Sequence, residues 1–198
     1  MPITMAISRP VIACVAAMLA VAPVMALAET PRELLSVAAF QTTDKAKALA
    51  LIGRAIADSD RILAARPGDH EATLQRGVAI GYRAKLTRSR SDARASLAIF
   101  EALAARDPRD PEAQMVIAGW HLDAIDQLGG FMARTMLGAK AQAGDAALAR
   151  AVALGGQGAF FPGLAAMMRI RSDSSAVAEA RKLAEAATRA ATPTPSIS

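Results

Sequence analysis

Two histidines are the first candidates for acid–base or metal chemistry in this chain. His70 is expected at the start of a helix, and His121 follows Trp120 inside another. A zinc site needs three or four ligands, and neither histidine has a second histidine three or four residues away. The spacing instead allows His121 a structural hydrogen bond with Asp123 or Asp126. We therefore expect no metal site at either histidine.

The remaining reactive residue types also lack the patterns that catalysis needs. No serine lies in a G-x-S-x-G turn. The paired carboxylates Asp58/Asp60 and Asp107/Asp110 fall where helix ends are expected, and helix capping explains carboxylates at such positions. The glycine-rich stretch 155–158 has neither the lysine nor the preceding strand of a phosphate-binding loop. We expect no enzyme and no cofactor.

The first residues are typical of a secretory signal. Arg9 precedes an unbroken apolar run over 11–21, and Ala26-Leu27-Ala28 supplies the small residues of a cleavage site. Cleavage after Ala28 predicts export to the periplasm and removes Cys14, the only cysteine. A lipid anchor on Cys14 is the less favoured alternative, because the apolar run follows this cysteine instead of preceding it.

The chain beyond residue 28 is expected to be all-helical. Its apolar residues recur every three or four positions, which is the period of amphipathic helices, and no stretch alternates with a period of two. One helical domain is predicted over 29–191. The tail 192–198, with two Thr-Pro pairs, is predicted to be disordered.

A repeated pattern lies inside this helical region. Leu63-Ala64-Ala65-Arg66 is followed by Pro67, Asp69 and Glu71-Ala72, and the same residue types recur over 103–113. Each copy ends one helix at a proline and caps the next with an acidic residue. Gly77 and Gly119 follow at similar distances, and we expect each to let a neighbouring helix approach closely. Gly129-Gly130, Gly144-Asp145 and 155–158 are expected to separate further helices.

These features resemble tetratricopeptide repeats (TPRs). The resemblance covers about 43–154 and rests on the small residue in the first helix, Phe100 in the alanine-rich second helix and the Asp107-Pro108 end. It implies antiparallel helix hairpins stacked as a short solenoid with a concave binding face. The chain departs from the family because Gly77 and Gly119 lie 42 residues apart, where the common repeat is roughly 34. We expect the extra length in the connection 86–90.

A looser similarity links the chain to exported bacterial repeat proteins and to the periplasmic T component of TRAP-type transporters. It rests on Gly119-Trp120-His121, Gly129-Gly130 and the segment 136–139.

Two groups of residues are candidates for binding. Methionine and aromatic side chains suit an adaptable apolar surface, although such stripes are more often core. The predicted lining of a partner or ligand site is Tyr82, Trp120, His121, Phe131, Met132, Met136 and Phe161. A basic patch is predicted from Arg83, Lys85, Arg88, Arg90 and Arg94, which would face an acidic partner or an anionic lipid head group. The alternative for this patch is a solvated connection between helices.

The sequence therefore predicts a periplasmic TPR-like binding or scaffold protein that recognises a protein or peptide and performs no catalysis. The first alternative is a transporter-associated protein that binds an apolar ligand, as the T-component similarity implies. The second is a purely structural envelope protein. Nucleic acid is not an expected partner, and no membrane-spanning segment is expected after signal cleavage, because no second long apolar run occurs.

Overall fold

The computed structural model describes residues 29–156, 158–173 and 175–191, which form nine α-helices and no strands. The predicted signal peptide 1–28 and the predicted disordered tail 192–198 lie outside the described residues. The helices are α1 (Pro31–Phe40), α2 (Lys45–Ala65), α3 (His70–Thr87), α4 (Arg90–Arg106), α5 (Pro111–Leu128), α6 (Gly130–Leu137), α7 (Ala141–Leu154), α8 (Phe160–Ser172) and α9 (Val177–Ala191). The predicted all-helical class is confirmed for this part of the chain.

Local sequence signals determine where the first five helices begin. Thr30 and Glu33 form a capping box at the start of α1, in which each side chain bonds the backbone of the other residue. Asp44, Asp69, Ser89 and Asp110 each accept hydrogen bonds from backbone N–H groups of the next helix. These side chains satisfy donors that have no partner inside the helix.

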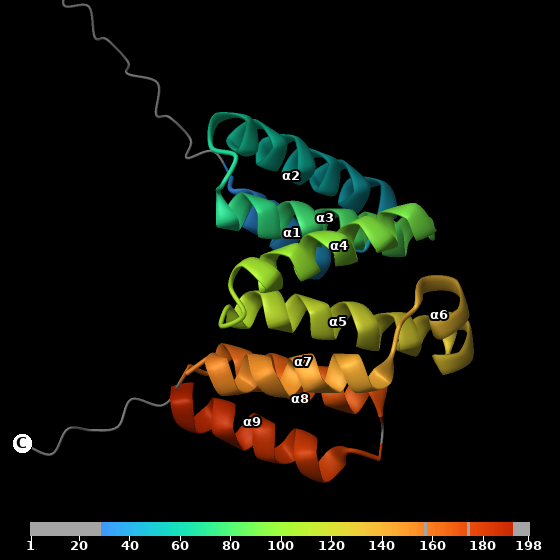
Figure 1. Cartoon of the computed structure of the whole chain (residues 1–198), viewed down its shortest axis with the longest axis vertical. Coiled ribbons are helices and arrows are strands. Elements are labelled where there is room, and N and C mark those ends of the chain that lie inside the picture. Colours follow the sequence, from blue (N-terminus) through green and yellow to red (C-terminus); the bar gives the residue numbers. More distant parts are fainter. Residues whose placement is uncertain (1–28, 157, 174, 192–198) are drawn as a thin grey trace, which may run out of the picture.

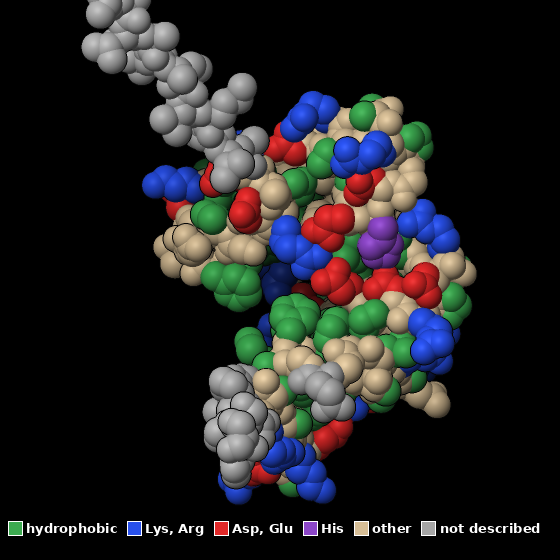
Figure 2. Space-filling view, turned by 90° about the vertical axis from the view of Figure 1, so that its left-hand side faces the viewer, with side chains coloured by type: hydrophobic (Ala, Val, Ile, Leu, Met, Phe, Trp, Pro, Cys, Tyr) green, Lys and Arg blue, Asp and Glu red, His purple; other side chains and the backbone are tan. Residues whose placement is uncertain are grey.

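Consecutive helices lie antiparallel and stack one after another along the long axis of the molecule (Figure 1). The pairs α1/α2, α3/α4 and α8/α9 are neighbours in sequence, whereas α5 pairs with α7 and the short α6 is inserted between them. The helices α1, α3, α5 and α8 also contact one another in that order. They form one side of the stack, and Figure 2 shows the molecule hollowed on one side at about mid-height.

Alanine dominates the interior and lets the helices pack closely. Ala38, Ala55, Ala79 and Ala118 are completely buried, and larger buried side chains such as Ile52 are few. Two main clusters result, one between α1, α2 and α3 and the other between α5, α7 and α8. A small side chain removes little apolar area from water, so stability here depends on many close helix contacts.

Gly77 has the role predicted for it. A Cβ atom at this position would lie 2.5 Å from Cε1 of Phe100 and 3.0 Å from Cγ2 of Ile99, both on α4. The glycine therefore allows α3 and α4 their observed separation. Gly119 differs, because its hypothetical Cβ meets only the flexible end of Met168.

Other sequence expectations were wrong. Gly144 does not separate two helices but lies within α7, where it packs against Leu122 of α5. The connection between α3 and α4 is only Arg88 and Ser89, so the extra repeat length lies in the helices and not in that connection. The helix α6 was not foreseen between the breaks at Gly129 and Gly138, which both adopt positive φ angles.

None of the described helices combines the length and the apolar character that crossing a bilayer requires.

Candidate binding groove

A groove of about 820 Å³ lies among α3, α5 and α8, with the first turns of α4 and the end of α6 at its border. This volume falls within the roughly 300–1,000 Å³ typical of ligand sites. Apolar side chains make up most of its surface. They include Val78, Tyr82, Phe100, Met115, Val116, Trp120, Leu122, Leu128, Met136, Leu137, Leu164 and Met168.

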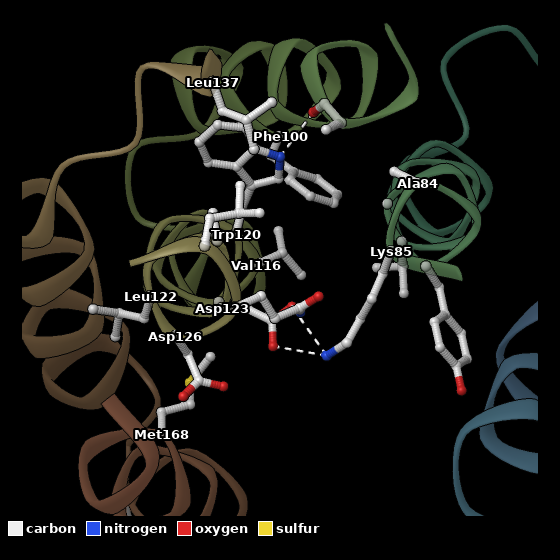
Figure 3. A pocket seen from close by; sticks show the side chains of 18 of the residues that line it. Ala84, Lys85, Phe100, Val116, Trp120, Leu122, Asp123, Asp126, Leu137 and Met168 are labelled. Atoms are coloured by element: carbon white, nitrogen blue, oxygen red, sulfur yellow. Dashed lines mark hydrogen bonds and ion pairs between the residues drawn. The ribbon is translucent and has the colours of Figure 1, made fainter. Parts of the chain in front are cut away.

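Trp120 is held rigidly in the wall of this groove. Its indole Nε1 donates a hydrogen bond of 2.7 Å to the backbone carbonyl of Ala93 on α4, as Figure 3 shows from within the groove. Phe100 and Leu137, labelled in the same view, line the groove together with Trp120. A fixed aromatic ring with its polar atom already bonded offers an apolar face to a ligand at little entropic cost.

A network of charged side chains crosses the same groove. Lys85 of α3 lies 2.8 Å from the Asp123 carboxylate of α5 (Figure 3). Arg171 of α8 lies 3.0 Å from both Asp123 and Asp126. The two carboxylates hold the pKa of Arg171 above its ordinary value, with the hydrogen bond to Asp126 as the largest cause. Three helices that line the groove are thus joined by ion pairs.

The predicted lining residues do not all meet in this groove. Tyr82, Trp120 and Met136 line it. The hydroxyl of Tyr82 donates to the backbone carbonyl of Ala38 at 3.1 Å and so ties α3 to α1. These three residues come from three different helices.

His121 is buried, and Phe161 is partly buried against the core. His121 is buried beside α7, and its Nδ1 accepts a hydrogen bond of 3.3 Å from the backbone N–H of Lys140, not from Asp123 or Asp126. Burial, and then the charge of Lys140, lower the pKa of His121, which favours the neutral ring that this acceptor role needs. Phe161 packs with the α5/α7/α8 cluster.

Phe131 and Met132 lie on α6 outside the groove. Their exposed fractions are 79% and 44%, so the structure places them at the surface and not in a shared lining with Trp120. Only Ala133 of α6 is buried.

The predicted basic patch divides into neutralised and unpaired residues. Arg83 makes two hydrogen bonds to Asp92, which raise the pKa of Arg83 and lower that of Asp92. Lys85 belongs to the groove network. Arg94 donates to the carbonyl of Met136 at 3.0 Å. Arg88 and Arg90 border the groove, and no carboxylate among the described residues pairs with them.

His70 lies at the edge where α3 begins. Its Nε2 is 3.0 Å from Oδ2 of Asp110, the residue that caps α5, so it links successive hairpins. Within the described ranges, no group of three or more His, Cys, Asp or Glu side chains is placed to hold a metal ion.

Asp123, Asp126 and Arg171 were not among the predicted site residues. The two aspartates lie one turn apart on α5, a spacing that places them on one face, and this signal was available in the sequence. Arg171 lies 45 residues beyond Asp126 in the sequence. No local pattern indicates that α8 packs beside α5.

The groove combines apolar walls with charged groups that already neutralise one another. Such a surface can take up apolar side chains between its helices, and a charged ligand group can exchange with Lys85, Asp123 or Arg171. Comparison of the chain with protein-family models, with curated proteins and with solved structures gave no match.

Proposed function

We propose that this chain is a TPR-like scaffold that binds a short segment of another protein in the groove among α3, α5 and α8, without catalysis. The observation that carries the proposal is the groove itself. It is large, mostly apolar and crossed by one ion-pair network. The stacked antiparallel pairs support the TPR-like description, since the first helices of such pairs line the concave side of a helical repeat.

The contacts favour a peptide segment with mixed character. Val116, Trp120 and Met168 offer apolar surface, and Lys85 and Arg171 are cations that share one carboxylate, Asp123. A segment with an acidic side chain between apolar ones would satisfy both parts, because its carboxylate can bond Lys85 or Arg171. The charged groups of the groove, once the segment covers them, would then keep their partners, which avoids the cost of unpaired buried groups.

The rigid setting of the groove supports recognition. The bond from Trp120 to Ala93 and the ion pairs across three helices hold its walls in place before a ligand arrives. Preorganised walls lower the entropy lost on binding.

An apolar small molecule is the second candidate, in keeping with the T-component similarity. The cavity volume of about 820 Å³ suits a ligand of this kind. The periplasmic location stays part of the proposal and rests on the sequence of residues 1–28 alone.

Selection from a random peptide library displayed on phage tests the proposal. Peptides that bind the purified protein are synthesised, and their affinity is measured by fluorescence polarisation. Ala124→Trp fills the groove, whereas Ala57→Trp places the same side chain on the exposed face of α2. We expect Ala124→Trp to weaken binding at least tenfold and Ala57→Trp to leave it unchanged.

Two outcomes would contradict binding of a peptide in the groove. Equal affinities for the two tryptophan variants, with the helical circular dichroism of both intact, would place the peptide elsewhere. A different set of results would favour the small-molecule candidate. No peptide would be selected, long-chain carboxylic acids would raise the melting temperature of the parent chain, and this rise would be absent in Ala124→Trp.

A further inference from the structure

One edge of the helix stack differs from the opposite edge in charge and in apolar exposure. We call this edge the α6 edge; it is the right-hand side of Figure 1. Four helices end there (α1, α3, α5 and α8), four helices begin there (α2, α4, α7 and α9), and α6 lies there between α5 and α7. In the helix halves next to it, basic residues outnumber acidic ones, whereas the two kinds are nearly equal in number in the other halves.

Most of the large exposed apolar side chains also lie along the α6 edge. They are Phe40, Leu128, Phe131, Met132, Ile170 and Val177. Phe160 lies at the opposite edge, at the start of α8. Apolar side chains gathered in this way on a surface indicate contact with another body.

The apolar and basic groups meet at α6. Phe131 and Met132 form what we call the α6 tip, with exposed fractions of 79% and 44%. Arg134 follows on the same helix, and the α6 backbone accepts a hydrogen bond from Arg94 of α4 at Met136.

The α6 edge also carries cations that the protein itself does not neutralise. Arg88, Arg90 and Arg134 are exposed, and no carboxylate among the described residues forms an ion pair with any of them. Arg94 bonds only a carbonyl. These four arginines are called the basic collar. At the opposite edge Arg32 is bonded to both Glu71 and Glu112.

We propose that the α6 tip and its basic collar bind the surface of a bilayer that contains anionic phospholipid. Charge complementarity selects this partner, because unpaired arginines and exposed apolar side chains that share one edge of the stack match lipid phosphates above acyl chains. A bilayer also accepts projecting side chains such as Phe131 without a preformed pocket. The α6 tip would enter the interface, and the groove would remain open for its own ligand.

Flotation of the full chain with vesicles tests this inference. Vesicles of phosphatidylcholine alone are compared with vesicles that also contain phosphatidylglycerol, at low and at high salt. We expect binding to the anionic vesicles, weaker at high salt because screening reduces the attraction. Residues 1–28 are common to all variants, so the differences between variants report on the α6 edge.

Two pairs of variants separate the α6 edge from the rest of the surface. Phe131→Ser is paired with Phe160→Ser at the opposite edge, and Arg134→Glu with the exposed Arg109→Glu in the connection between α4 and α5. Phe131→Ser should weaken binding roughly tenfold or more, and Arg134→Glu by more than about fivefold, the effect of one basic residue near a lipid surface. The two control variants should bind like the parent chain.

A fluorescence readout locates the contact directly. Phe131→Trp should show emission that brominated acyl chains quench, and Phe160→Trp should not exceed the quenching of the parent, whose only tryptophan is Trp120. Equal binding by Phe131→Ser and Phe160→Ser would overturn the inference. So would equal affinity for neutral and anionic vesicles, or binding of soluble polyglutamate without quenching of Phe131→Trp, which would point to an acidic protein instead. Ala124→Trp should leave vesicle binding intact, so failure of the groove proposal is distinguishable.

Discussion

Replacing Gly77 by alanine tests the close approach of α3 and α4 that helps to shape the groove. The added methyl group would lie 2.5 Å from Phe100 and 3.0 Å from Ile99, and both side chains belong to the neighbouring helix. Phe100 is only 4% exposed, so its ring has little room to withdraw. Gly53 is the matched control, because it lies within α2 and no atom lies within 4 Å of its hypothetical Cβ.

The two substitutions share one energetic effect and differ in another. Alanine in a helix interior is more favourable than glycine by about 1 kcal/mol, so Gly53→Ala should raise the free energy of unfolding by about that amount. Gly77→Ala gains the same amount and also suffers overpacking, which costs about 1–3 kcal/mol. Gly77→Ala should therefore be less stable than Gly53→Ala by about 1–3 kcal/mol.

Urea denaturation followed by circular dichroism measures both free energies of unfolding. Melting temperatures should differ in the same sense, by about 2–4 °C for each kcal/mol in a domain of this size. If Gly77→Ala proves as stable as Gly53→Ala, α3 and α4 are not packed as described. A second substitution, Phe100→Leu in the Gly77→Ala chain, should recover part of the loss.

Three further predictions concern the contacts that join the helices. Arg32 holds the pKa of Glu71 below its ordinary value, so this pair stabilises the fold above the unfolded pKa of that carboxyl and loses its effect as pH falls. Arg32→Ala should therefore flatten the acid side of a curve of stability against pH, and an unchanged curve would refute the coupling. Tyr82→Phe removes the hydrogen bond to Ala38 and should lower the free energy of urea unfolding by about 1 kcal/mol, whereas a stability equal to the parent's would show that this bond contributes nothing. Asp110→Ala removes the cap of α5 and should lower the melting temperature, with a loss of about 1 kcal/mol; no loss would mean that the cap is replaced by solvent.

Much of the helical framework could be predicted because its signals are local. The capping residues Asp44, Asp69 and Asp110 stand directly before the helices they cap, and Pro67 and Pro108 follow the helices that end there. A cap or a proline acts on the backbone next to it, so its effect does not depend on the rest of the fold.

Glycines were harder to interpret. Gly77 and Gly144 both face a neighbouring helix, yet only Gly77 was predicted to do so. A glycine that breaks a helix and a glycine that admits a neighbour look alike in a single sequence. Their difference depends on what packs against them, which is a property of the tertiary structure.

The candidate site could be predicted only in part for the same reason. Tyr82 and Trp120 line the groove, but Phe131 lies on an inserted helix whose orientation periodicity does not determine. The ion pairs of Asp123 join helices that are 38 and 48 residues away in the sequence. Ion pairs between residues so far apart in the sequence depend on how the helices stack, and no sequence motif predicts them.

Photochemical crosslinking locates the bound peptide on the protein and so tests binding in the groove. A selected peptide that carries a photoreactive phenylalanine is bound to the full chain and irradiated, and the attachment sites are identified by mass spectrometry. We expect attachment to residues of α3, α5 and α8 that line the groove, such as Val78, Val116 and Met168. These adducts should be lost in Ala124→Trp and retained in Ala57→Trp. Adducts confined to α2, α9 or the α6 tip, unchanged by Ala124→Trp, would show that the peptide does not bind in the groove.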